Sequence, residues 1–205
     1  MTVQAQAIKR GRKFDQVLEG ARQVFMADGF ERASVDEIAA VSGVSKATLY
    51  SYFPDKRLLF TEVVRTECHR QSDRAMATID ISAPADTVLR LAAWHMIGFF
   101  LSEFGQRMFR ICVAESASFP ELGREFYNSG PLIANQSLSA YFGQAIERGE
   151  LRIDDLELAA FQFAELCKAR LFNRVVFGVQ REFSHAEINR VVDGAVDVFM
   201  ARYGG

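Results

Sequence analysis

Residues 45–51 place short hydrogen-bonding side chains and one cation on the predicted exposed face of a short helix. Hydroxyl groups both donate and accept hydrogen bonds, and a lysine carries a positive charge. Groups of this size and polarity suit the base edges and phosphate oxygens of a major groove. The set comprises Ser45, Lys46, Thr48, Tyr50 and Ser51. The alternative interpretation is an ordinary helical hairpin whose exposed residues are merely polar.

The surrounding segment, residues 34–53, has the layout of a helix-turn-helix. Ser34 and Glu37 form a capping box at the start of a short helix that extends to about Ser42. Gly43 can take the left-handed conformation of the turn, and Ala39 is small enough for a close helix crossing. The remaining signals are apolar residues Ile38, Val44 and Leu49, a cap at Ser45 and a stop at Pro54. Their joint occurrence favours the helix-turn-helix over the ordinary hairpin.

Helical periodicity extends over nearly the whole chain, and alternating strand patterns are absent. The clearest apolar face comprises Phe14, Val17, Leu18, Ala21 and Phe25, and it stops at Gly29. We expect an all-α fold of nine or ten helices, with residues 1–55 as one domain and residues 56–205 as a second. The predicted helices cover about residues 14–28, 35–42, 46–53, 56–77, 87–104, 107–117, 121–128, 132–148, 155–177 and 185–202. A capping box at Ser184 and Glu187 opens the last one.

The net charge of −2 and the pI of about 6.0 do not by themselves suggest a nucleic-acid partner. The charge is unevenly distributed, because residues 1–60 carry nine Lys and Arg against seven Asp and Glu. A basic cluster precedes the first helix and consists of Lys9, Arg10, Arg12 and Lys13. Such a cluster is either a solvated tail or a basic arm that reaches phosphates or a minor groove.

Enzymatic chemistry has little support in this sequence. The chain has no Gly-rich phosphate loop, HExxH or GxSxG motif, and its three histidines lack metal-ligand spacing. The three cysteines, Cys68, Cys112 and Cys167, are far apart and are expected to be reduced thiols. We expect no cofactor and no metal. The N-terminus lacks the apolar core of a signal peptide and no apolar run spans a bilayer, so a soluble cytoplasmic protein is expected.

The motif from Asp36 to Phe53, followed by Lys56 and Leu59, resembles the DNA-binding domain of TetR/AcrR-family regulators. The resemblance covers about residues 12–60. Residues 119–151 are similar to the ligand-binding region of the AcrR/AefR-like branch. The resemblance implies a homodimer that binds a pseudo-palindromic DNA operator through two N-terminal heads, with a ligand-sensing helical core.

When the family's DNA contacts are carried over by position, the resemblance implies a set of contacts in and around the second short helix. Tyr52 departs from the family, which often has histidine there, but its hydroxyl can still reach a phosphate. The implied contacts are Ser34, Ser45, Lys46, Thr48, Tyr50, Ser51, Tyr52 and Lys56.

The 18 phenylalanines suggest a thick core, an apolar cavity or an apolar interface. Apolar residues gather in two successive helices around residues 94–112, which is typical either of a pocket for a hydrophobic or aromatic effector or of a plain Phe-rich core. The family resemblance favours the pocket. The proposed ligand-binding residues are Trp94, His95, Phe99, Phe100, Met108, Phe109, Cys112, Phe126 and Tyr127. Met96, Phe104 and Phe142 belong to the same apolar group, and Glu103, Gln106 and Arg110 could add polar contacts.

The last helices are the implied dimer seam, because in the family two of them pair with their symmetry mates in a four-helix bundle. The seam residues are Leu158, Phe161, Glu165, Lys168, Phe172, Ile188, Val192, Ala195 and Phe199. Burial against the chain's own core is the alternative for some of them. We expect a repressor that the effector releases from DNA; an activator, or a ligand carrier of the same fold, is the alternative.

Overall fold

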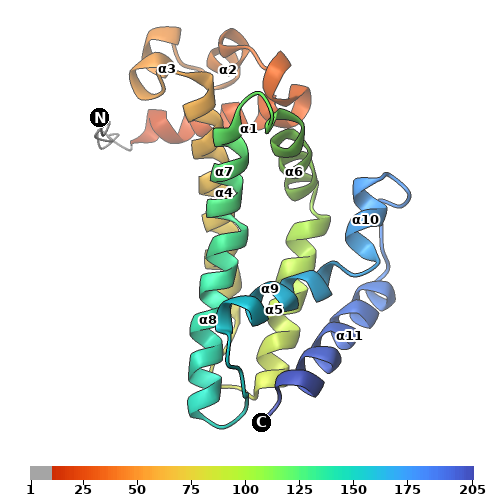
Figure 1. The fold of residues 1–205 in the computed structure, drawn as a ribbon. Helices are drawn as coiled ribbons and strands as arrows, with labels where there is room; N and C mark the ends of the chain where they lie inside the picture. Colours follow the sequence, from red (N-terminus) through yellow and green to blue (C-terminus); the bar gives the residue numbers. More distant parts are fainter. Residues whose placement is uncertain (1–10) are drawn as a thin grey trace. The chain divides into compact units, whose positions relative to one another are not determined.

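The computed structural model describes residues 11–205, and this part of the chain is helical apart from its connections and one isolated antiparallel bridge (Figure 1). The predicted all-α class is therefore confirmed. The residues pack as two compact units. The first runs to Glu67 and includes Ile111–Phe126, whereas the second comprises Cys68–Arg110 and Tyr127–Gly205.

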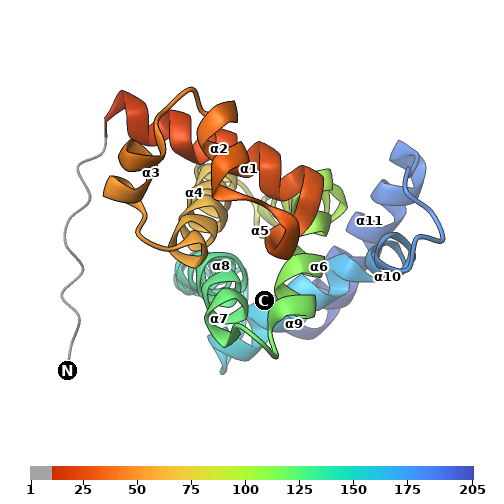
Figure 2. The same cartoon turned by 90° about the horizontal axis from the view of Figure 1, so that it is seen from above.

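The first unit is built on α1 (Arg12–Arg32), α2 (Val35–Val41), α3 (Lys46–Tyr52) and the beginning of α4 (Lys56–Thr78) (Figure 2). The end of α6 (Glu103–Glu115) and the start of α7 (Pro120–Ser129) also belong to it. The predicted apolar face of α1 is buried as a whole. Gly29 interrupts α1 with φ 80°, a conformation that glycine adopts without a steric cost. The chain then returns Phe30 to the core, where it is 3% exposed.

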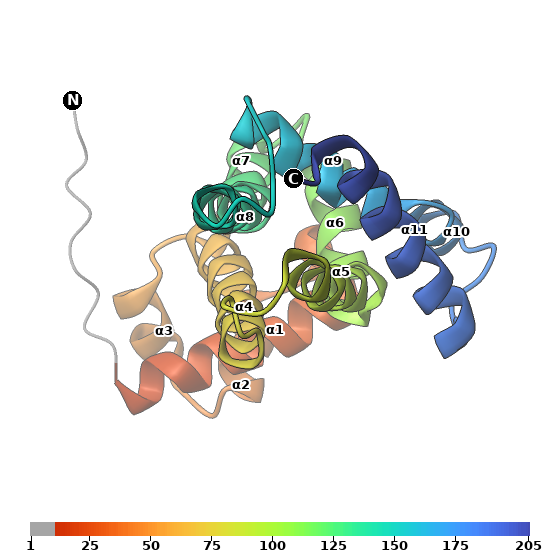
Figure 3. The same ribbon diagram turned by 90° about the horizontal axis from the view of Figure 1, so that it is seen from below.

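The second unit contains α5 (Ala85–Leu101), α8 (Pro131–Glu147), α9 (Leu156–Lys168), the short α10 (Leu171–Val176) and α11 (His185–Tyr203). Helix α9 packs against both α5 and α8, and α11 packs against α5 and α9 (Figure 3). The ring of Phe199 lies at the centre, 5.2 Å from Phe142 and 5.1 Å from Phe163 between ring centroids. The aromatic core thus joins α8, α9 and α11.

Each predicted helical range contains an observed helix, with ends shifted by a few residues. One prediction is wrong: residues 155–177 do not form a single helix. The backbone turns at Ala169 and Arg170, and Arg170 has φ 64°, a left-handed conformation that is unusual for a residue with a Cβ. The turn separates α9 from α10 and gives eleven helices over residues 11–205.

Helices α1 and α2 approach closely at Gly20. A methyl group built there would lie 2.1 Å from Ser42 Oγ and 2.9 Å from the Ser42 backbone nitrogen. The serine hydroxyl could rotate away, but the backbone nitrogen could not. The sequence predicted Ala39 as the small residue where the two short helices α2 and α3 cross. The structure adds Gly20, at the contact between α1 and Ser42, as a second position where size is limited.

We expect Gly20→Ala to lower the free energy of unfolding by about 1–3 kcal/mol, because the added methyl overpacks the contact between α1 and α2. This loss outweighs the roughly 1 kcal/mol that alanine gains over glycine in a helix. Thermal or urea unfolding measures the effect. Gly143→Ala in α8 is the control, since a methyl there meets no atom within 4 Å and should stabilise the protein. Equal stabilisation by both substitutions would contradict the close contact.

Candidate nucleic-acid interface

The turn between α2 and α3 has the predicted geometry (Figure 2). Ser34 Oγ accepts a hydrogen bond of 3.1 Å from the Glu37 backbone nitrogen, which caps α2. Gly43 takes the left-handed conformation with φ 64°. Its backbone allows a sharp turn that a β-branched residue would resist. Of the apolar residues predicted to hold the pair, Ile38 and Leu49 are buried and Val44 is partly exposed; Ala39, predicted at the helix crossing, is also buried.

Helix α3 is fixed by its own hydroxyl groups. Ser45 Oγ accepts from the Thr48 backbone nitrogen at 3.1 Å and lies 2.9 Å from Thr48 Oγ1. Ser51 Oγ donates to the Thr48 carbonyl at 2.6 Å. Each hydroxyl keeps further hydrogen-bonding capacity, because it carries one donor and two acceptor positions. Thr48 is partly exposed, whereas Ser45, Lys46, Tyr50 and Ser51 are exposed, and the Tyr50 side chain is large enough to reach well beyond the helix.

The cation on this face is paired within the chain. Lys46 Nζ forms an ion pair with Asp36 in the first turn of α2, and both side chains are more than half exposed. Solvent-exposed pairs of this kind contribute little to stability. Lys46 can therefore exchange Asp36 for a phosphate at low cost. Asp36 was not predicted as a partner, because the pairing depends on the angle between α2 and α3.

Lys56 has a different role from the predicted phosphate contact. Its ammonium group donates to the carbonyl oxygens of Phe30, Glu31 and Ala33 at 2.8, 3.1 and 3.2 Å. An ammonium has three hydrogens, so these bonds use all of them. The structure assigns Lys56 to closing the end of α1, where a cation also satisfies helix carbonyls. These three bonds leave no ammonium hydrogen of Lys56 for the predicted phosphate contact.

The junction that follows α3 is held by aromatic and ionic contacts. Tyr52 packs edge-on against Phe14 with ring centroids 5.7 Å apart, and Phe53 lies 5.3 Å from the same ring. Asp55 caps α4 by accepting from the Arg57 backbone nitrogen at 2.8 Å. The Arg57 guanidinium also binds the Asp55 carboxylate and holds the pKa of that carboxyl below its usual range. The cap at Asp55 was predicted from the sequence, whereas the contact with the Arg57 guanidinium was not.

The basic arm is only partly described. Arg12 and Lys13 begin α1 and are exposed, which is compatible with a contact to a polyanion. Lys9 and Arg10 lie outside the described residues.

Several predicted effector residues form an aromatic cluster in the second unit. Phe100 and Phe109 both contact Phe172, with ring centroids 6.0 and 5.1 Å apart. Phe99 adjoins Phe100 at 6.4 Å. Lys168 Nζ lies 5.4 Å above the Phe100 ring and 5.7 Å from that of Phe172. Phe172 and Lys168, predicted for the dimer seam, are thus engaged within the chain because the turn at Arg170 directs α10 back towards α5 and α6.

The other predicted effector residues are distributed over both units. Trp94 contacts His185 with ring centroids 5.8 Å apart, and His95 Nε2 lies 2.7 Å from Thr78 Oγ1. Met108 is fully buried and Tyr127 is 47% exposed. Cys112 and Phe126 belong to the first unit, whereas the remaining seven belong to the second.

Polar contacts accompany the aromatic cluster. Gln106 is buried and donates through Nε2 to the Phe100 carbonyl, while its Oε1 atom is buried without a partner. Arg110 donates to the Val175 carbonyl at 2.7 Å. An unsatisfied buried acceptor beside aromatic rings is suited to a ligand donor or a water molecule.

The predicted dimer seam needs a correction on α11. Val192, Ala195 and Phe199 are 2%, 3% and 1% exposed in the single chain, because they face α5, α8 and α9 of their own unit. A partner chain cannot reach side chains that are already buried. Leu158 is 51% exposed, Glu165 is exposed, and Phe161 and Ile188 are partly exposed. The opposite face of α11 adds Val198, which is 56% exposed and was not predicted.

The described residues offer little reactive chemistry. Cys68, Cys112 and Cys167 are buried, and burial raises the pKa of Cys167 to about 12. A thiol with such a pKa is a poor nucleophile at neutral pH. Over residues 11–205 no group of three or more His, Cys, Asp or Glu side chains is arranged to hold a metal. Over the same residues, no helix combines the length and apolarity needed to cross a bilayer.

Two family profiles match the chain, one in its N-terminal part and one in its C-terminal part. Residues 17–63 match the profile of bacterial regulatory proteins of the tetR family. Residues 87–205 match the C-terminal domain of AefR-like transcriptional repressors. Among curated proteins, the uncharacterized helix-turn-helix regulator YhgD of Bacillus subtilis (strain 168) is 23% identical over 161 residues, which are 77% of this chain and 81% of YhgD.

Solved structures agree over almost the whole length. A protein of Mesorhizobium loti, provisionally assigned to the TetR family of transcriptional regulators, is 28% identical with a TM-score of 0.86, covering 95% of this chain and 98% of that protein. The flavonoid-responsive regulator FrrA is 33% identical with a TM-score of 0.81, over the same two shares.

We expect Asp36→Asn to raise affinity for DNA severalfold, because Lys46 can then bind a phosphate without first breaking its ion pair with Asp36. The slope of log affinity against log salt should change little, because Lys46 would neutralise the same single phosphate in both proteins. Titration of a labelled duplex at several salt concentrations measures both effects. Glu31→Gln removes the same charge from an exposed position nearby, and an equal gain from that control would attribute the effect to net charge instead of Lys46.

Proposed function

Because the chain belongs to the TetR family of bacterial transcriptional regulators and has an AefR-like C-terminal domain, we propose that it is a ligand-responsive repressor acting as a dimer on a pseudo-palindromic operator. Membership makes it a DNA-binding regulator and places it in a non-enzymatic family. The observation that carries the proposal is the helix-turn-helix, in which α3 is capped by Ser45 and presents Lys46 and Tyr50 to solvent.

In the proposed complex, α3 is the recognition helix and enters the major groove. Lys46 neutralises a phosphate, and Tyr50 contacts a base edge or the backbone. Two recognition helices about 34–36 Å apart would occupy successive turns of one face of the duplex. The proposed DNA contacts are Ser34, Ser45, Lys46, Thr48, Tyr50, Ser51 and Tyr52.

Substitution of the recognition helix tests this proposal. We expect Tyr50→Ala to reduce affinity for the selected operator by about 1–3 kcal/mol, through loss of a specific contact. Lys46→Ala should weaken operator and random-sequence binding alike and reduce the salt slope by about one unit. The operator is a duplex selected from a random pool by the wild-type protein. Thermal unfolding and sedimentation check that both variants remain folded with unchanged mass, and operator binding that survives both substitutions would exclude α3 as the recognition helix.

A dimer through α9 and α11 fits the exposed apolar residues of the second unit. Leu158 on α9 and Val198 on α11 are each more than half exposed, and Phe161 is partly exposed. Beyond α10, Phe177 is 78% exposed, which is unusual for a large aromatic side chain. Pairing of two copies would remove these side chains from water and set the distance between the two recognition helices.

The proposed effector is an aromatic small molecule. The support is the cluster of Phe99, Phe100, Phe109 and Phe172 with the unsatisfied Gln106 oxygen, together with the similarity to FrrA, a flavonoid-responsive regulator. Aromatic rings suit a planar apolar ligand, and an amide oxygen accepts from a phenol. We infer that a flavonoid-like polyphenol is the best first probe.

A titration with a flavone, a flavanone and an isoflavone tests this effector class, with a twelve-carbon fatty acid as the apolar control. We expect one flavonoid to lower operator affinity by at least about tenfold, which requires a difference of about 1.4 kcal/mol between its affinities for the free and DNA-bound states. Fluorescence of Trp94, the single tryptophan of the sequence, reports binding independently. Fluorescence that saturates while operator affinity stays constant would show binding without regulation and would contradict the proposal.

A further inference from the structure

The first unit, which holds the helix-turn-helix, contains a segment that the family match places in the C-terminal domain. Residues 111–126 fall inside the match to the AefR-like C-terminal domain, yet they pack with α1 to α4 in the first unit. We call residues 115–121, which comprise the last residue of α6, the connection and the first two residues of α7, the α6–α7 corner. Two of its side chains contact the DNA-binding helices, one through charge and one through an aromatic ring.

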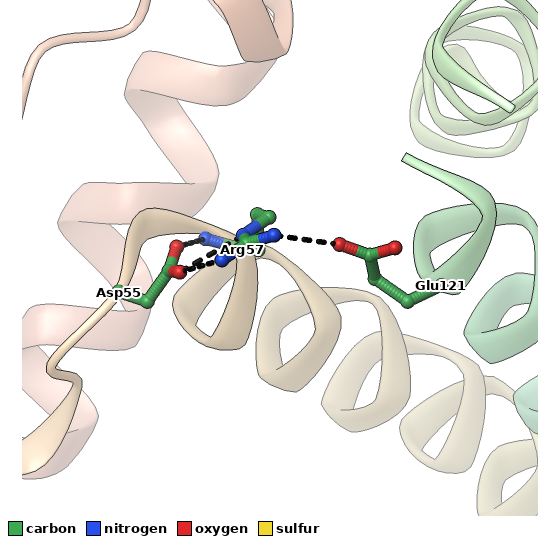
Figure 4. A network of polar contacts seen from close by, with 3 residues as sticks. All are labelled: Asp55, Arg57 and Glu121. Atoms are coloured by element: carbon green, nitrogen blue, oxygen red, sulfur yellow. Dashed lines mark hydrogen bonds and ion pairs between the residues drawn. The ribbon is translucent and has the colours of Figure 1, made fainter. Parts of the chain in front are cut away.

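The ionic contact joins Glu121 of α7 to Arg57 in the first turn of α4, the helix that follows α3 (Figure 4). Arg57 Nη1 donates to Glu121 Oε1 at 3.2 Å, while the same guanidinium donates through Nε to Asp55 Oδ2 at 2.9 Å. Arg57 therefore bridges two carboxylates. Asp55 lies three residues after the last residue of α3 and caps α4. The Arg57 side chain therefore links Glu121 to the residues that follow α3.

The aromatic contact reaches the end of α1. Phe119 packs edge-on against Phe30, with ring centroids 5.4 Å apart and an interplanar angle of 68°. Phe30 also packs edge-on against Phe60 of α4 at 5.3 Å and lies 4.7 Å below Lys56 Nζ. Edge-to-face aromatic pairs have a preferred geometry, so they constrain orientation as well as distance. Phe119 thus orients the residues where α1 and α4 meet.

We propose that Phe119 and Glu121 are positioning residues for operator recognition: they hold the start of α4 and the end of α1 in the arrangement that presents α3 to DNA. This inference rests on the proposed function, because it assigns a regulatory input to the same recognition helix. Neither side chain needs to touch DNA. The α6–α7 corner is the part of the C-terminal family domain that acts directly on the DNA-binding helices.

Substitution of Glu121 removes its contact with Arg57 and leaves the contact between Arg57 and Asp55 in place. Its side chain and that of Arg57 are 45% and 46% exposed, so loss of the pair has little effect on stability. Arg57→Gln, in contrast, removes the contact to Asp55 as well. A purely structural role would change the unfolding temperature, whereas a positioning role changes the preference for operator over random DNA.

The experiment compares Glu121→Gln, Arg57→Gln and the double variant with the wild type, using the full-length protein and its selected operator. We expect Glu121→Gln to lower operator affinity about threefold, the scale of one exposed ion pair, with unchanged random-sequence affinity and unfolding temperature. The double variant should bind the operator like Arg57→Gln alone, because Glu121 acts through Arg57. Glu19→Gln removes the same charge from an ion pair within α1 and should not lower operator affinity.

Phe119→Leu tests the aromatic contact separately. It keeps apolar volume while removing the ring edge, and we expect up to about tenfold weaker operator binding. Operator affinity that is unchanged or raised in both Glu121→Gln and Phe119→Leu, with wild-type binding intact, would overturn the inference. Additive losses in the double variant would likewise show that Glu121 does not act through Arg57. Failure of the wild type to select any operator would instead refute the proposed function.

Discussion

The ring of Phe30 is the contact on which the DNA-binding unit depends. It follows Gly29, whose positive φ lets the chain leave the axis of α1 and return to the core. Rings from three other positions, Phe25, Phe60 and Phe119, surround it, and Lys56 covers it. One buried side chain therefore joins α1, α4 and the α6–α7 corner. The support of α3 is assembled around this ring, since α3 itself is only seven residues long and an isolated helix of that length is unstable.

Lys46 at the start of α3 and Lys56 at the start of α4 show how context decides the role of a charge. Both were predicted to contact DNA from their positions in the sequence. Lys46 is paired with one exposed carboxylate, which a phosphate can replace. Lys56 instead donates to three carbonyls at the end of α1, where no equivalent replacement exists without opening a helix terminus. Position along a motif thus identifies candidate cations, and hydrogen-bond geometry distinguishes between them.

Local features were predictable from the sequence because their physical causes are local. The caps at Ser34, Ser45 and Ser184, the turn at Gly43 and the apolar face of α1 depend on residues a few positions apart. Long-range features were not. The seam prediction included Val192 and Phe199 because helical periodicity cannot say whether an apolar face meets its own core or a partner. The contact between Arg57 and Glu121 spans 64 residues and has no signal in either local segment. The break at Arg170 was missed because neither glycine nor proline marks it.

If Lys46 binds phosphates as proposed, its ion pair with Asp36 also affects how quickly the protein can search a genome. On non-specific DNA, affinity comes mainly from phosphate neutralisation. Each transient encounter through Lys46 must first displace Asp36, so the net attraction to an arbitrary sequence is lower than the exposed lysine suggests. Weaker non-specific attachment shortens the residence time at each wrong site and favours hopping between distant segments. In the proposed DNA complex, a carboxylate outside the set of contact residues would thereby influence the time needed to find the operator.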